Sequence, residues 1–248
     1  MALWDVKAKA ADLPLVNLLG VKHKRVRAYN SCGLWLRNDN PESLADECEE
    51  LLAEGGYKGI KLRIGYASPE EDLKAIRVVR NRLDPNVCLM SDFNQSLDAD
   101  DALRRCRVLD DEGLYWIEEP VRGDDEAAHM KMVREATDAL IAGGESEGTL
   151  YGIRHLIQHG GLQVVQSDIL GGGGFTGLFR MAALAEAHHT YIAPHGASYP
   201  EINSHFVAAV PNGPVSYTHL RAPETEAELE CRLLLEKKKG GGGGGGGG

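Results

Sequence analysis

Residues 87–92 are Val-Cys-Leu-Met-Ser-Asp, a short apolar run that ends on a carboxylate. A helical pattern of apolar residues follows at Ala99–Asp111, and the next apolar run, Tyr115–Ile117, also ends on a carboxylate at Glu118. A short apolar run followed by a helical pattern predicts a buried strand and the helix that crosses over to the next strand. Two such units in succession predict neighbouring parallel strands.

The same unit repeats throughout residues 26–213. Further apolar runs on both sides have the length of buried strands: Val26–Tyr29, Gly59–Ile64, Leu140–Ala142, Leu162–Gln166 and Thr190–Ala193. Helical patterns separate the runs, for instance Pro41–Glu54, Glu70–Leu83 and Thr176–Ala187. The sequence therefore predicts an α/β fold with a parallel sheet of seven strands. The 248 residues are about the length of one eight-stranded α/β barrel.

Composition and charge exclude several classes of protein. The net charge is −10 with no basic stripe, which argues against nucleic acid or an anionic membrane as a partner. No apolar run is long enough to span a bilayer, and no signal peptide precedes the repeating units. The five cysteines are odd in number and lack C-x-x-C spacing, so we expect reduced thiols and a cytoplasmic protein.

The chain divides into three parts. Residues 1–25 are predicted to be a helix and a linker that enters the sheet, and residues 26–213 hold the repeating units. Residues 214–248 are expected to be a disordered, non-native tail, because Val215–Leu220 resembles translated sequencing adapter and a lysine run then passes into glycines. Since Pro214, Pro223 and the glycine run interrupt a hydrogen-bonded ladder, we expect the tail not to replace the missing last strand.

Ionisable residues lie in or after most of the predicted strands. Lys61 and Arg63 are in the second strand, and five others end or follow the next strands: Asp92, Glu118, Glu145, Asp168 and His195. From Arg63 onward these residues are 29, 26, 27, 23 and 27 positions apart, about one strand–helix unit each time. A single such residue is usually a helix cap or a solvated turn residue. Because the carboxyl ends of barrel strands meet at one mouth, however, the series predicts a site there.

The residue types in this series predict a metal site. Asp92, Glu118 and Glu145 would repel one another unless a cation lay between them. An all-oxygen ligand set favours Mg²⁺, with Mn²⁺ as the alternative. Lys61 and Arg63 are two positions apart, so in a strand they share a face on which they can neutralise a carboxylate-bearing substrate.

The last two residues of the series predict acid–base chemistry. Asp168 and His195 follow successive strands, so the carboxylate could orient and charge the imidazole. A metal, a cation and a base together favour abstraction of a proton next to a carboxylate, through an enediolate that the metal stabilises.

Several motifs, in this order, carry a family resemblance. They are Ala2-Leu3-Trp4-Asp5, Gly59-Ile60-Lys61-Leu62-Arg63-Ile64-Gly65, Asp92-Phe93-Asn94-Gln95-Ser96, Trp116-Ile117-Glu118-Glu119-Pro120, Gly144-Glu145, Asp168 with Gly172–Gly177, and His195. Over about residues 2–213 the chain resembles the barrel domain of the mandelate racemase group of the enolase superfamily. The resemblance implies a truncated (β/α) barrel of the TIM type, without its last strand and its N-terminal α+β capping domain.

The resemblance also implies roles for these residues. The family's metal ligands fall on Asp92, Glu118 and Glu145, and its His–Asp dyad falls on His195 and Asp168. The implied activity is Mg²⁺-dependent dehydration of an acid sugar, a hydro-lyase reaction that begins with abstraction of the proton α to the carboxylate. The implied partner is a small carboxylate, an acid sugar or a 2-hydroxy acid, and the complete enzyme is expected to be a homo-oligomer. Three further residues are expected to contact the substrate: Asn94, Tyr199 and Glu201.

Departures from the family pattern leave one alternative close to this prediction. The family's racemases have a second lysine where this chain has Arg63, and arginine is not deprotonated in a protein. A racemase or epimerase acting on a 2-hydroxy acid, with Lys61 as the second base, is therefore the alternative. Because the capping domain and the last strand's substrate-binding carboxylate are missing, we expect the chain by itself to be inactive.

Two further functions belong to other classes. Gly144–Gly148 matches G-x-S-x-G, and Asp168 and His195 follow it in the order of an α/β-hydrolase, so a serine hydrolase is a distant alternative. That interpretation gives no role to Lys61 or to the earlier carboxylates. The other possibility is a non-catalytic binding or scaffold protein, which would not bind Mg²⁺.

Overall fold

The computed structural model describes residues 1–23, 25–31, 40–55, 57–122, 126–196 and 200–213, together with the backbone of 216–218 and 228–230. Tyr199 and most of the predicted tail lie outside these residues.

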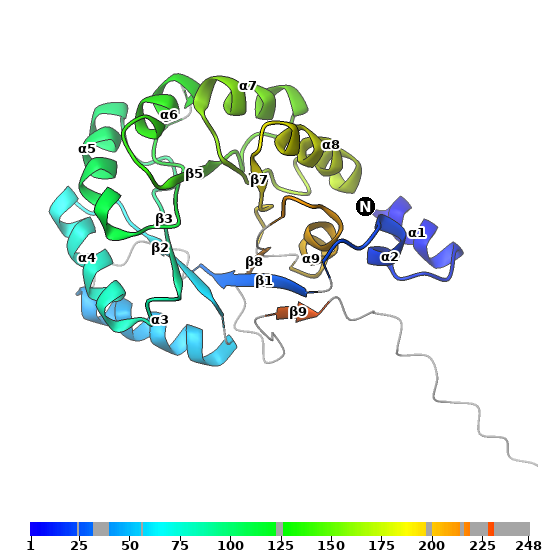
Figure 1. The fold of residues 1–248 in the computed structure, drawn as a ribbon, viewed down its shortest axis with the longest axis horizontal. Coiled ribbons are helices and arrows are strands. Elements are labelled where there is room, and N and C mark those ends of the chain that lie inside the picture. Colours follow the sequence, from blue (N-terminus) through cyan, green and yellow to red (C-terminus); the bar gives the residue numbers. More distant parts are fainter. Residues whose placement is uncertain are drawn as a thin grey trace, which may run out of the picture.

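The strands form one sheet in which neighbours are also consecutive in the chain. In order they are β1 (Arg25–Asn30), β2 (Gly59–Arg63), β3 (Cys88–Asp92), β4 (Trp116–Glu118), β5 (Leu140–Gly143), β6 (Val164–Val165) and β7 (Tyr191–Ile192). Every adjacent pair in this series is parallel. The order has no reversal, so the sheet curls as a barrel wall does, and Figure 1 shows it as an arc.

Helices cover the outer side of this arc (Figure 1). The helices that follow the strands are α3 (Pro41–Gly55), α4 (Pro69–Arg82), α5 (Ala99–Leu109) with the 3₁₀ turn η1 (Asp110–Glu112), α6 (Glu126–Arg134), α7 (Leu150–Gly160), α8 (Gly174–Ala187) and α9 (Pro200–Ala209). Two more helices, α1 (Ala2–Ala10) and α2 (Leu15–Leu19), precede β1. These features confirm the predicted truncated α/β barrel.

Side-chain caps fix where α4, α5 and α7 begin, and so set the length of the loops after β2, β3 and β5. Ser68 accepts a hydrogen bond from the backbone N–H of Glu71, with Pro69 in the first turn of α4. Asp98 caps α5 and Thr149 caps α7 in the same way. Such caps satisfy backbone donors that the first helical turn leaves free.

The apolar residues pack in two layers. The larger layer lies between the sheet and the helices and includes, for example, Ile60, Val79 and Ile117. The smaller layer consists of residues in the strands or directly after them, on the inner face of the arc: Tyr29, Met90, Trp116, Ala142, Val164 and Ala193. No helix in the part of the chain that the structure describes is long and apolar enough to cross a membrane.

Strand register brings the site residues to one level. Arg63 pairs with Asp92, and Asp92 pairs with Glu118, so three neighbouring strands end side by side. The β2–β3 ladder has five registered pairs, whereas β5–β6 and β6–β7 have two pairs each. Residues after the shorter ladders are therefore placed by loops more than by the sheet.

Two short segments of the predicted tail pair with β1. The strand β8 (Ser216–Thr218) is parallel to β1, and β9 (Glu228–Glu230) is antiparallel to it. The expectation that the tail interrupts every ladder is therefore wrong for these segments. The β1 edge that does not face β2 offers backbone N–H and C=O groups with which a further strand can pair. In the part of the chain that the structure describes, no ladder joins β8 to β7.

Candidate active site

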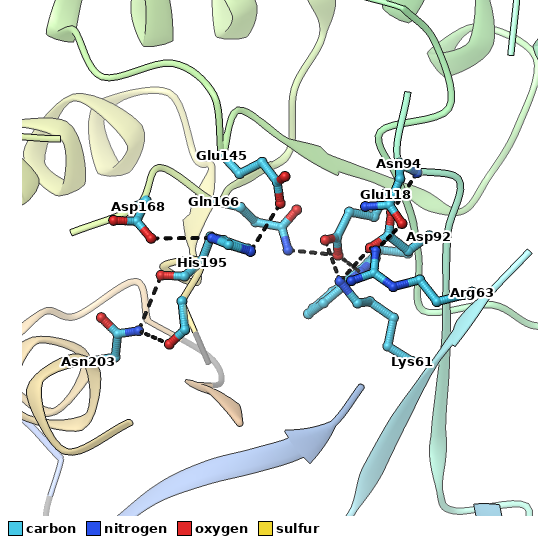
Figure 2. Close-up of polar contacts among 12 residues, drawn as sticks. Lys61, Arg63, Asp92, Asn94, Glu118, Glu145, Gln166, Asp168, His195 and Asn203 are labelled. Carbon is cyan, nitrogen blue, oxygen red and sulfur yellow. Dashed lines mark hydrogen bonds and ion pairs between the residues drawn. The ribbon is translucent and has the colours of Figure 1, made fainter. Parts of the chain in front are cut away.

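The predicted ionisable residues lie at the carboxyl ends of β2 to β7 and form two groups (Figure 2). One group contains Lys61, Arg63, Asp92 and Glu118 from β2, β3 and β4. The other contains Glu145, Asp168 and His195, from the loops that follow β5, β6 and β7. The sequence predicted that all of these residues converge on one site, and the structure brings them into contact within each of two groups.

In the first group, the cationic side chains form ion pairs with the carboxylates. The Lys61 Nζ atom donates to Asp92 Oδ2 at 2.8 Å and also to Glu118 Oε1. Arg63 Nη1 donates to Asp92 Oδ2 and to the side-chain oxygen of Asn94. Lys61, Asp92 and Glu118 are each only 1% exposed. Two buried carboxylates are thus held together by cations, as buried charges require.

Burial and neighbouring charges shift the pKa values of these acids in different directions. Burial favours a higher pKa for Asp92, but the charges of Lys61 and Arg63 and the hydrogen bonds from Lys61 and from the Asn94 backbone N–H outweigh it and lower the pKa below its usual value. Burial and the charge of Asp92 raise the pKa of Glu118 to about 7. Burial and the charge of Glu145 likewise raise the pKa of Glu119 to about 8. In both residues burial is the larger cause, and the charge of a neighbouring carboxylate adds to it.

The second group centres on the imidazole of His195. Its Nδ1 atom lies 3.3 Å from Asp168 Oδ2, and its Nε2 atom lies 3.2 Å from Glu145 Oε2. The other oxygen of Asp168 accepts the backbone N–H of Leu170 at 2.6 Å, which fixes the carboxylate. The His195 side chain is 32% exposed, so it can meet a ligand. An imidazole oriented by a carboxylate in this way is suited to acid–base catalysis.

A contact from α9 holds the end of β7 that carries His195. Asn203 Nδ2 donates to the carbonyl oxygen of His195 at 3.3 Å and to that of Gly196 at 3.0 Å. Gly196 has φ +120°, which favours glycine, and a Cβ atom there would lie 3.2 Å from Asp168 Oδ2. The sequence His-Gly is therefore what this close approach requires.

Two residues that the sequence analysis did not single out bind Glu118. Gln166 Nε2 donates to Glu118 Oε2 at 2.8 Å, and Trp116 Nε1 donates to the same oxygen at 3.1 Å. Trp116 precedes Glu118 by two positions in one strand, so alternation places both side chains on one face and could have indicated the contact. No sequence pattern pointed to Gln166.

The predicted substrate contacts have different outcomes. Asn94 joins the first group through Arg63. Glu201 is exposed in the first turn of α9, and its side chain joins neither group among the described contacts. Tyr199 lies outside the described residues. These three assignments stay predictions.

The donor chemistry at Asp92 and Glu118 suits a hard cation. Their carboxylates are buried, end adjacent strands, and already surround the Lys61 ammonium group. Glu145, the third predicted ligand, contacts His195 instead. Within the described residues, no three His, Cys, Asp or Glu side chains lie close enough together to hold a metal ion. Mg²⁺ ligation by all three carboxylates therefore stays a prediction that the residue types support.

The geometry does not favour the serine hydrolase alternative. In the G-x-S-x-G stretch the structure places Glu145, rather than Ser146, against His195. The strands also follow one another in sequence order without the reversal found in doubly wound sheets.

Comparisons with known proteins agree with this architecture. The chain is 34% identical over 212 residues to 3,6-anhydro-alpha-L-galactonate cycloisomerase of Streptomyces coelicolor, covering 86% of this chain and 57% of that protein. It is 35% identical over 214 residues to L-talarate/galactarate dehydratase of Salmonella typhimurium, covering 86% of this chain and 52% of the relative. The chain thus spans just over half the length of these relatives.

Solved structures extend the comparison to the fold. L-talarate dehydratase from Polaromonas sp. JS666, crystallised with Mg and L-glucarate, superposes with a TM-score of 0.81 at 34% identity. The match covers 88% of this chain and 60% of that one. A model of the family described as enolase C-terminal domain-like matches residues 43–236. On these grounds, the chain belongs to the enolase C-terminal domain-like family.

Proposed function

We propose that the protein is an Mg²⁺-dependent acid-sugar dehydratase, a hydro-lyase that abstracts the proton α to a carboxylate. The observation that carries this proposal is His195 held by Asp168 at the mouth where buried carboxylates and cations also gather. A base, a charge-neutralising group and oxygen ligands for a metal are the parts that such a reaction needs.

Each residue has a defined task in this reaction. His195 Nε2 would take the α-proton once Glu145, which lies 3.2 Å from that atom, serves as a metal ligand instead; Nδ1 stays with Asp168, whose charge stabilises the imidazolium. The α C–H bond and the β C–O bond break, a C=C bond forms, and the imidazolium can return its proton to the departing hydroxyl as water. The enol product then tautomerises to a 2-oxo acid.

The cationic residues supply the electrostatic part. Lys61 and Arg63 offset the negative charge that develops on the substrate carboxylate as the proton leaves. Mg²⁺, when bound by Asp92, Glu118 and Glu145, supplies a Lewis acid for that carboxylate.

The relatives support an acid sugar as the substrate class. One is named a dehydratase of talarate and galactarate, and another is named an arabinonate dehydratase. The Polaromonas structure contains L-glucarate. All of these ligands are small polyhydroxylated carboxylates. A cytoplasmic, homo-oligomeric enzyme without nucleic-acid or membrane partners is part of the same proposal.

Ligand binding by this chain tests the proposal. Calorimetry should show saturable Mg²⁺ binding, and galactarate, L-talarate or L-glucarate should bind more tightly when Mg²⁺ is present. Glu118→Gln should weaken both, whereas Glu47→Gln on the outer helix α3 should change neither. Absence of saturable Mg²⁺ binding by the wild-type chain would refute the proposal.

The position of Lys61 keeps a racemase or epimerase as the second candidate. Figure 2 shows Lys61 and His195 on opposite sides of Gln166, as two bases on either face of a substrate would be. The ammonium of Lys61 is bound by two carboxylates, however, which favours its protonated form. Inversion at the α-carbon with uptake of solvent deuterium, and without loss of water, would identify the racemase.

A further inference from the structure

We propose that Gln166 and Trp116 are positioning residues that fix the Glu118 carboxylate, so that Oε1 is the oxygen presented toward Lys61 and Asp92. The inference rests on the proposed function, because that side of Glu118 is where Mg²⁺ is expected.

The hydrogen bonds to Glu118 are divided between its two oxygens. Gln166 Nε2 and Trp116 Nε1 both donate to Oε2, at 2.8 and 3.1 Å, while Lys61 Nζ donates to Oε1. An indole N–H can only donate, and an amide NH₂ group can only donate as well. Rotation of the carboxylate about its own axis would therefore break contacts on both oxygens.

Gln166 is itself held on several sides. Its backbone N–H donates to the Gly143 carbonyl at 2.8 Å, and its own carbonyl accepts the backbone N–H of His195 at 3.1 Å. The residue is 2% exposed, which leaves its side chain few alternative rotamers. Among the described residues Oε1 of Gln166 has no hydrogen-bond partner. Flipping the amide would turn this oxygen against the Glu118 carboxylate, so Glu118 sets the orientation of the amide.

Packing holds Trp116 in the same way. The indole is fully buried and lies edge-on to the Tyr29 ring, with ring centroids 5.2 Å apart. The ring centroid of Tyr115 lies 5.5 Å from that of Trp116. This packing fixes the direction of the indole N–H group, which donates to Glu118 Oε2.

Residues behind a metal ligand commonly control how well the ligand binds. Loss of such a partner typically lowers metal affinity roughly 10- to 100-fold, because the ligand then has several orientations of similar energy. Gln166 also joins the backbone of β6 to His195, so one residue contacts both groups of the site. Neither Gln166 nor Trp116 carries a charge that would attract the cation directly.

A metal-free measurement tests the fixed geometry first. The indole N–H resonance of Trp116 is assigned in spectra of ¹⁵N-labelled protein as the signal that disappears in the Trp116→Phe variant. In Gln166→Met this indole N–H should exchange faster with solvent, because the Glu118 carboxylate can rotate away. Gln163→Met is the matched control: its Oε1 accepts the Ile141 N–H at 3.1 Å, away from the site. Unchanged exchange in Gln166→Met overturns the proposal.

Calorimetry with Mg²⁺ then tests the consequence. Gln166→Met and Trp116→Phe should each bind Mg²⁺ roughly 10- to 100-fold more weakly than the wild type, and Gln163→Met should bind as the wild type does. Thermal melting of the metal-free variants shows which of them are folded. If Gln166→Met is unfolded, the Mg²⁺ affinity of Trp116→Phe alone tests the proposal. Equal affinity in both variants and the wild type overturns the proposal. If the wild type binds no Mg²⁺, the proposed function fails, and the indole measurement still decides whether Glu118 is held.

Discussion

The ion pair between α4 and α5 gives a stability prediction whose size follows from its contacts. Asp72 is 0% exposed, and its Oδ1 accepts the backbone N–H groups of Gly65 and Tyr66 at 2.8 and 2.9 Å. Its Oδ2 binds Arg105 Nη1. Arg105 is 5% exposed and also donates to the Tyr66 carbonyl and to Asp101. The pair thus holds the loop that directly follows Arg63.

The substitution Arg105→Met removes the cation and leaves the Asp72 charge buried with two backbone donors. Removing one partner of a buried ion pair costs about 3–5 kcal/mol. For a domain of this length each kcal/mol shifts the melting temperature by about 2–4 °C, so the expected loss is about 6–20 °C. In an Asp72→Asn background the same substitution should cost less, because no unpaired charge remains.

Urea unfolding followed by circular dichroism gives the free energy of unfolding for each variant. Arg104→Met is the matched control, because Arg104 is on the same helix and 70% exposed, and its ion pair with Asp101 is a surface contact at 3.3 Å. Such a contact contributes at most about 1 kcal/mol. The reasoning is refuted if Arg105→Met costs no more than Arg104→Met, or if the Asp72→Asn background leaves the loss unchanged.

Three further predictions concern other parts of the chain. Asp92→Asn should lower Mg²⁺ affinity by more than the roughly 10- to 100-fold typical of residues that only hydrogen-bond to a ligand. An unchanged Mg²⁺ affinity in calorimetry contradicts the role of Asp92 as a ligand. Burial lowers the pKa of His205 below 6.5 in the folded protein. The free energy of unfolding should therefore be highest above pH 6.5 and should fall as the pH drops toward the folded-state pKa, because the unfolded chain binds the proton more readily. His205→Gln should flatten that fall in unfolding titrations; an equally steep fall excludes the assignment. Gly196→Ala should cost about 1–3 kcal/mol through its positive φ and the approach to Asp168, more than Gly113→Ala, whose added Cβ meets nothing within 4 Å.

The strands and helices were predictable because one alternation runs through the chain. The predicted strand Gly59–Ile64 is observed as Gly59–Arg63, and the predicted helix Pro41–Glu54 as Pro41–Gly55. Each element buries one face against a neighbour, so its periodicity is local and visible in the sequence. The strand-end residues Asp92 and Glu118 were predictable for the same reason, since register places them side by side.

Contacts that depend on side-chain direction were not predictable. Glu145 was expected beside Asp92 and Glu118, but it follows β5 in a loop and contacts His195. Asp72 and Arg105 lie on different helices, where a charged residue usually indicates a solvent-facing position. Gln166 has neither charge nor a characteristic spacing, and only the folded sheet brings its amide to Glu118.

The strands that carry the two groups of the site differ in how extensively they are paired with their neighbours. Lys61 and Asp92 are carried by β2 and β3, which share five registered pairs, whereas β7, which precedes His195, shares only two with β6. Local opening starts where few backbone hydrogen bonds must break, so amide exchange should be faster at Val165 than at Leu62. Under the proposed function, the imidazole of His195 would adjust to carboxylates of different length while Lys61 and Asp92 stay in place.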